Sequence, residues 1–115
     1  MSCVMSVQVR LQQALSRALK ERDTEAVSAL RSALGAIANA EAVPVPQRTG
    51  TEVMLGVGPS EVPRRELTKD EIDGIVEAEI VERRQAAAGL VGLGQDAHME
   101  RLVEQAKVLE RVLRD

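Results

Sequence analysis

Apolar residues recur at intervals of three and four positions in two stretches near the start of the chain. Over 24–42 these residues are Val27, Leu30, Leu34, Ile37 and Ala38. Over 7–22 they are Val7, Leu11, Ala14, Leu15, Ala18 and Leu19. This spacing places each set on one stripe of a helix with 3.6 residues per turn. We therefore predict helices over 7–22 and 24–42, and their short junction makes them antiparallel neighbours.

Polar residues stand where these two helices should begin. Ser6 is a candidate N-cap of the first helix, and Asp23 and Thr24 precede the second; the oxygens of such side chains accept from the free amides of a first turn. Pro44 is expected to close the second helix. Gly35 lies inside it at a cost of about 1 kcal/mol relative to Ala, which indicates a close crossing with a neighbouring helix.

The second half of the chain predicts another pair of helices. Thr68-Lys69-Asp70-Glu71 is a capping box, in which Thr68 and Glu71 each accept from the other's backbone amide. Leu67 and Ile72 can form the accompanying hydrophobic staple. A helix over 68–88 follows, then a glycine-rich break over 89–94. A last helix over 96–114 has apolar spacing close to that of a coiled coil.

Between the two pairs, periodicity disappears. The stretch 43–67 contains all four prolines of the chain and three of its glycines. Loops of this length are uncommon inside compact domains, and we expect this one to be mobile or to lie across the helices. The fold class predicted is therefore all-α: one domain, 1–115, built as a four-helix bundle of two helical hairpins joined by a long Pro/Gly-rich loop.

Composition narrows the classes of function. The chain has no Phe, Tyr or Trp and a formal net charge of −3. It therefore lacks the aromatic platforms on which single-stranded nucleic acids usually stack and has no net attraction to a phosphate backbone.

The same sequence indicates the compartment. A single cysteine, Cys3, excludes an internal disulfide and fits a reducing cytoplasm. No apolar run approaches the roughly 20 residues of a membrane span. The start MSCVMSVQVR lacks the basic residues and long apolar core of a signal peptide. We expect a cytoplasmic protein with no membrane partner.

Candidate catalytic and metal-binding chemistry is sparse. The one histidine, His98, and Cys3 are far apart in the sequence, so no structural zinc site is expected. No Gly-x-Ser-x-Gly elbow accompanies His98, and GVGPSEVPRRE is not a phosphate-binding loop. We predict no catalytic residue, metal or cofactor. The pairs Arg64-Arg65 and Arg83-Arg84 fit either a solvated face or a site for an acidic partner or a phosphate.

Several short motifs together resemble the N-terminal helical part of the GatB/YqeY family. In chain order they are Leu11-x3-Leu15-x2-Ala18-Leu19-x2-Arg22-Asp23, Leu30-Arg31 with Ala36-Ile37-x-Asn39-x-Glu41, Leu67-Thr68-x-Asp70-Glu71, Glu79-Ile80-x2-Arg83-Arg84, Gly94 and Glu104-x4-Leu109-Glu110-x2-Leu113. The segment 61–68 is similar to the variant of high-GC Gram-positive bacteria. Full-length members continue past the fourth helix with a Tyr-Leu-Pro turn and a second small helical domain, whereas this sequence ends at Asp115.

The resemblance implies a relation to tRNA-dependent amide transfer. Members of the family are similar to the tRNA-handling tail of the B subunit of glutamine-dependent aspartyl/glutamyl-tRNA amidotransferase. It implies a noncatalytic interaction module whose partners are amidotransferase subunits, tRNA or another protein. The polar residues that coincide with the family pattern form the candidate interaction surface: Arg31, Asn39, Glu41, Arg83 and Arg84.

Two alternatives remain open from the sequence. In one, the chain is an accessory component of a carbon–nitrogen ligase with glutamine as amido donor, which amidates mischarged Glu- or Asp-tRNA. In the other, it is a self-associating helical protein, a homo-oligomer formed through the apolar stripe of 96–114.

Overall fold

The computed structural model describes residues 6–42 and 66–115. Four helices account for most of them: α1 (Val7–Glu21), α2 (Thr24–Glu41), α4 (Lys69–Ala88) and α5 (Asp96–Arg114). The described residues form no strand, and the predicted all-α class with four helices is confirmed. The helix bounds lie within one residue of those predicted. Most of the predicted loop 43–67, namely 43–65, lies outside the described residues.

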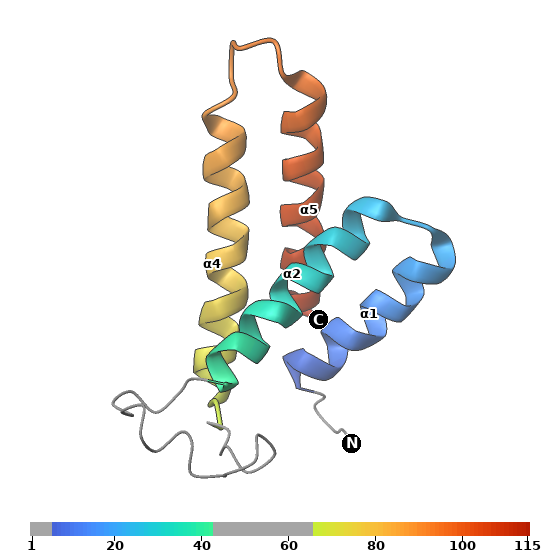
Figure 1. Cartoon of the computed structure of the whole chain (residues 1–115), viewed down its shortest axis with the longest axis vertical. Helices are drawn as coiled ribbons and strands as arrows, with labels where there is room; N and C mark the ends of the chain where they lie inside the picture. The colour runs from blue at the N-terminus through green and yellow to red at the C-terminus, as the bar shows by residue number, and fades with distance from the viewer. Residues whose placement is uncertain (1–5, 43–65) are drawn as a thin grey trace, which may run out of the picture.

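The helices form two hairpins that cross each other. α4 and α5 stand side by side, and the α1–α2 hairpin lies at an incline across their lower part (Figure 1). Both α1 and α2 contact α4 and α5, and α2 makes the larger part of the contact between the hairpins. The upper part of the α4–α5 hairpin extends beyond α1 and α2 (Figure 1).

Aliphatic side chains from all four helices meet where the hairpins cross. The largest fully buried ones are Leu11, Leu30, Ile37, Val76 and Leu109. Each such side chain contributes about 1.5–3 kcal/mol of transfer free energy when buried. Residues 6–42 and 66–115 therefore share one core, which contains no aromatic residue.

The buried face of α2 is displaced from the predicted stripe. Ala29 and Ala33 are fully buried, whereas Ala38 is exposed. Small side chains at these positions let the neighbouring helices approach closely, so alanines join Leu30 and Ile37 in the core. The predicted close crossing at Gly35 is wrong: this residue is exposed, and a Cβ there would meet no atom within 4 Å.

The predicted helix starts are confirmed. The side chains of Ser6 and Asp23 accept from Val9 N and Ala26 N, both at 3.2 Å. In the capping box, Thr68 N donates to Glu71 Oε1 at 2.9 Å, and Glu71 N donates to Thr68 Oγ1 at 3.1 Å. Leu67 packs, partly buried, against the core cluster that includes Ile72. These contacts fix the residues at which α1, α2 and α4 begin.

Candidate interaction site

A tight turn between α1 and α2 lies beside a hollow of the described surface. α1 ends at Glu21, and Arg22 takes the left-handed conformation with φ 59° while its N–H donates to the carbonyls of Ala18 and Leu19. Left-handed residues other than glycine are uncommon, and this one reverses the chain within two positions. Asp23 then starts α2. The end of α1 and the first turns of α2 therefore lie next to each other.

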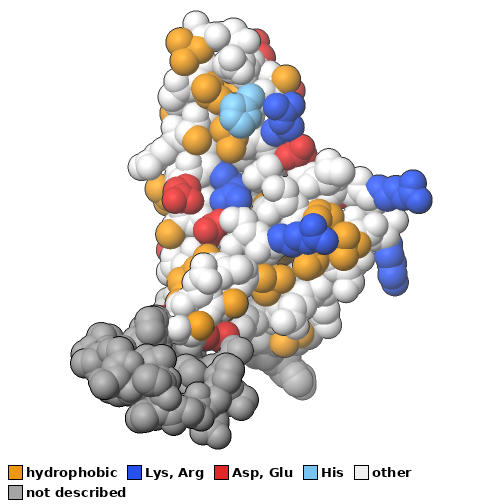
Figure 2. Space-filling view, viewed as in Figure 1, with side chains coloured by type: hydrophobic (Ala, Val, Ile, Leu, Met, Phe, Trp, Pro, Cys, Tyr) orange, Lys and Arg blue, Asp and Glu red, His pale blue; other side chains and the backbone are white. Residues whose placement is uncertain are grey.

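Between these helix ends lies an open groove of about 850 Å³. The residues that line it are Leu19, Arg22, Thr24, Val27, Ser28, Arg31 and Ser32. Leu19 is 49% exposed, although its place in the apolar repeat predicts a core position. Figure 2 shows hydrophobic atoms beside basic side chains over the α1–α2 hairpin. We name this hollow, defined by its seven lining residues, the α1–α2 groove.

The two arginines of the α1–α2 groove are exposed, and neither has an ion-pair partner within the described residues. Two acids at the start of α2 accept hydrogen bonds from other groups. Asp23 Oδ1 accepts from Ala26 N at 3.2 Å, and Glu25 Oε1 accepts from Gln105 Nε2 at 2.7 Å. The groove therefore combines apolar surface with positive charge that is not neutralised by a bound carboxylate.

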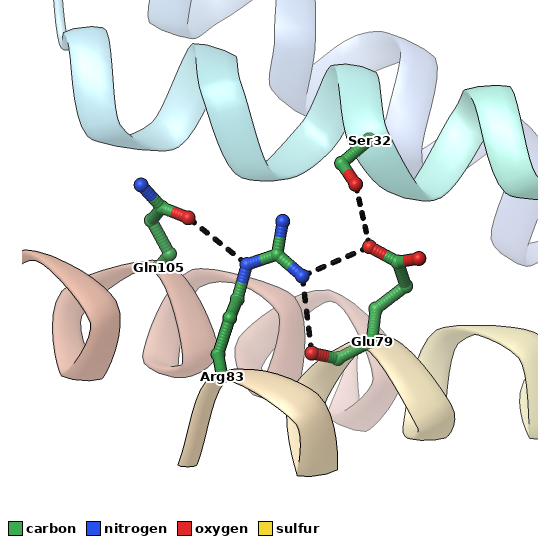
Figure 3. A network of polar contacts seen from close by, with 4 residues as sticks. All are labelled: Ser32, Glu79, Arg83 and Gln105. Atoms are coloured by element: carbon green, nitrogen blue, oxygen red, sulfur yellow. Dashed lines mark hydrogen bonds and ion pairs between the residues drawn. The ribbon is translucent and has the colours of Figure 1, made fainter. Parts of the chain in front are cut away.

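Arg83, in contrast, lies in a polar network at the crossing of the hairpins (Figure 3). Its Nε donates to Gln105 Oε1 at 2.9 Å, and its Nη1 donates to Glu79 Oε1 at 2.9 Å and to Glu79 O at 3.1 Å. Ser32 Oγ donates to Glu79 Oε1 at 2.6 Å. The side chains of Arg83 and Glu79 are only 12% and 15% exposed. We call Glu25, Ser32, Glu79, Arg83 and Gln105 the junction network, because together they connect α2, α4 and α5.

Arg84 belongs to a different pair. Its Nε and Nη2 donate to the two carboxylate oxygens of Glu110 at 3.0 and 2.7 Å. This hydrogen-bonded pairing raises the pKa of Arg84 and lowers the pKa of Glu110. The pair links α4 to α5 at the surface, where the side chains of Arg84 and Glu110 are 44% and 32% exposed.

The other two predicted surface residues lie near the far end of α2. Asn39 is exposed, and Glu41 accepts from Gln8 Nε2 at 3.3 Å. At 1.5 Å per helical residue, Arg31 and Glu41 are about 15 Å apart along the helix axis. The structure therefore separates the five sequence candidates: Arg31 lies in the α1–α2 groove, Asn39 and Glu41 lie beyond it, and Arg83 and Arg84 bond within the chain.

Sequence reasoning missed Leu19, Arg22 and Val27 as members of a site. Leu19 and Val27 belong to the apolar repeats and were therefore assigned to the core. A signal for them existed in the turn: a two-residue connection brings the last turn of one helix against the first turn of the next, and Arg22 stands at its centre.

The described residues offer neither a metal site nor a membrane-spanning helix. Among residues 6–42 and 66–115, no group of three or more His, Cys, Asp or Glu side chains could hold a metal ion. No helix in that part of the chain is long and apolar enough to cross a membrane. The stripe on 96–114 that suggested self-association is buried within the chain at Ala106, Leu109 and Val112, and oligomerisation itself stays a prediction.

Comparison of the chain with protein-family models, with curated proteins and with solved structures finds no significant match.

Proposed function

We propose that this chain is a noncatalytic helical interaction module of the GatB/YqeY type, acting in the cytoplasm. The observation that supports it best is the α1–α2 groove, where Arg22 and Arg31 line the same hollow as Leu19 and Val27 and have no ion-pair partner in the described part of the chain. Exposed charge beside exposed apolar surface is typical of a contact patch for another molecule. The sequence resemblance suggests the partner, a tRNA-dependent amidotransferase or its tRNA.

The proposal narrows the predicted interaction surface. Arg31 is retained from the five sequence candidates, because its guanidinium is available to a partner. Arg83 is mostly buried by its own neighbours, so a partner would have to displace Gln105 and Glu79 to reach it. Partner binding is therefore assigned to the α1–α2 groove rather than to the α4 arginines.

The test compares three tagged proteins in affinity capture from cell extract, with captured proteins and RNA both identified. Arg31→Glu reverses a charge in the groove. Arg17→Glu makes the same change at an exposed position of α1 that does not line the groove, and so serves as the matched control. We expect the wild type and Arg17→Glu to recover amidotransferase subunits or tRNA, and Arg31→Glu to lose them.

Two results would count against the proposal. Equal recovery by Arg31→Glu and the wild type would remove the groove from the interaction. Recovery of neither amidotransferase subunits nor tRNA by any of the three proteins would retire the GatB/YqeY assignment. Far-ultraviolet circular dichroism of each variant, which needs no aromatic residue, verifies that the helices are intact.

A further inference from the structure

We propose that the α1–α2 groove binds an acidic amphipathic helical segment of a partner protein. This inference rests on the proposed function and deepens it, since it names the chemistry of the partner. Two properties of the groove lead to it: the apolar surface between the helix ends, and the arrangement of charge relative to that surface along α2.

The apolar part of the groove calls for an apolar side chain. Leu19 is 49% exposed at the end of α1, and Val27, which is partly buried, lines the same hollow from α2. An aliphatic side chain placed between them would remove both from water, which is the dominant favourable contribution to most protein association. A free anion such as phosphate has no apolar group to pack against this surface.

The charged part of the groove favours a partner that carries carboxylates at a defined spacing. Val27 and Arg31 are four residues apart on α2, so they are neighbours on one helical face, one turn from each other. A helix lying along this face would place an apolar residue against Val27 and a carboxylate, one turn away, against Arg31. The guanidinium of Arg31 can bind a carboxylate through two parallel hydrogen bonds. Arg22, which also lines the hollow, offers a second cation.

Nucleic acid fits the groove less well. The groove offers two arginines, which are few for a phosphate backbone. It also has no aromatic residue to stack on a base. An amphipathic helix in a groove is a common mode of peptide recognition, and acidic residues provide the charge complementarity that fixes its register.

The experiment is a selection from a displayed library of helical peptides, which assumes no particular sequence. Wild-type protein is the bait, and the counter-bait is the double variant Arg22→Asn/Arg31→Glu. Asparagine is chosen at position 22 because it tolerates the left-handed backbone found there. Arg17→Glu is a second bait with the same type of charge change outside the groove. Circular dichroism of all three baits confirms equal helix content.

We expect peptides that bind the wild type and Arg17→Glu but not the double variant, with aliphatic residues at helical spacing and an acid one turn away. For a selected peptide, replacing that acid by its amide should weaken binding to the wild type about two- to fivefold, the range of a solvent-exposed ion pair. The same replacement should leave binding to Arg31→Met unchanged, because the carboxylate then has no partner there.

Other outcomes would overturn this inference, and they can be told apart from a failure of the proposed function. Enriched peptides that need the groove but carry no acids would exclude the acidic helix. Failure to enrich groove-dependent peptides, together with Arg31-dependent capture of tRNA from extract, would assign the groove to nucleic acid and retain the interaction module. Failure of both measurements would remove the proposed function as well.

Discussion

The junction network and the α1–α2 groove place the same residue type in opposite surroundings. Arg83 in the network is 12% exposed and donates to three acceptors on α4 and α5. Arg31 in the groove is exposed and has no ion pair among the described residues. Ser32, next to Arg31 in sequence, lies at the edge of both regions: it lines the groove and donates to Glu79 at 2.6 Å.

The difference indicates which arginine is free for function. A mostly buried guanidinium that donates to neighbouring groups stabilises the fold through these partners, and removing it leaves them without their hydrogen bonds. An exposed guanidinium without a partner contributes little to stability, so its positive charge is available to a ligand. The following predictions test this separation, from the largest expected effect to the smallest.

The largest contrast is between two leucines. Leu30 is fully buried at the junction, whereas Leu19 is 49% exposed in the groove. Leu30→Ala should lower the free energy of unfolding by about 2–5 kcal/mol, because it leaves a cavity between the hairpins. Leu19→Ala should lower it by less than about 1 kcal/mol, because water already reaches that side chain. Urea unfolding followed by circular dichroism at 222 nm measures both; losses of equal size would mean that Leu19 is part of the core.

The next contrast is between the arginines. Arg83→Met keeps the aliphatic stem but removes the donors to Glu79 and Gln105, and should cost about 1–2 kcal/mol of unfolding free energy. Arg31→Met should stay within about 0.5 kcal/mol of the wild type. Combining Arg83→Met with Glu79→Gln gives a double-mutant cycle that isolates the coupling between the two charges. An unchanged stability of Arg83→Met would return this residue to the candidate interaction surface.

The sequence predicted the helices well because its signals are local. Apolar spacing, the capping oxygens of Ser6 and Asp23, and the Thr68–Glu71 box depend on neighbours within one or two turns. The division of the arginines is not local. Whether Arg83 meets Gln105 depends on how α4 and α5 align, and whether Leu19 is covered depends on how the hairpins cross. Periodicity therefore assigned Leu19 to the core, and the family resemblance placed Arg83 with Arg31 on one surface.

A substitution on the exposed face of α2 should raise the free energy of unfolding, whereas the previous ones lower it. Gly35 is four residues beyond Arg31, exposed, and a Cβ there would contact nothing within 4 Å. Gly35→Ala should therefore raise the free energy of unfolding by about 0.5–1 kcal/mol, because alanine restricts the unfolded chain and suits a helix interior. A higher midpoint of thermal unfolding by circular dichroism would verify it. A lower midpoint would contradict the prediction and mean that this face of α2 is covered in solution.

The smallest effect on the free energy of unfolding concerns the Arg84–Glu110 ion pair. This pair is more exposed than the junction network, and Arg84 has a carboxylate partner, unlike the groove arginines. Its hydrogen bond from Arg84 lowers the pKa of Glu110 in the folded chain. A carboxyl with a depressed folded pKa stabilises the fold above its unfolded pKa, and this stabilisation is lost as the pH falls through the folded pKa. Because both side chains are partly solvated, the contribution should not exceed about 1 kcal/mol.

Urea titrations should be made on the wild type and Glu110→Gln from neutral pH to below the ordinary glutamate pKa of about 4.3. The free energies of unfolding of the two proteins should differ at neutral pH and converge in acid. Glu104→Gln is the matched control on α5, since Glu104 is exposed and forms no ion pair with a described residue. It should follow the wild type throughout. A Glu110→Gln curve that stays parallel to the wild type down to low pH would show that the pair stabilises through packing of the Arg84 stem rather than through charge.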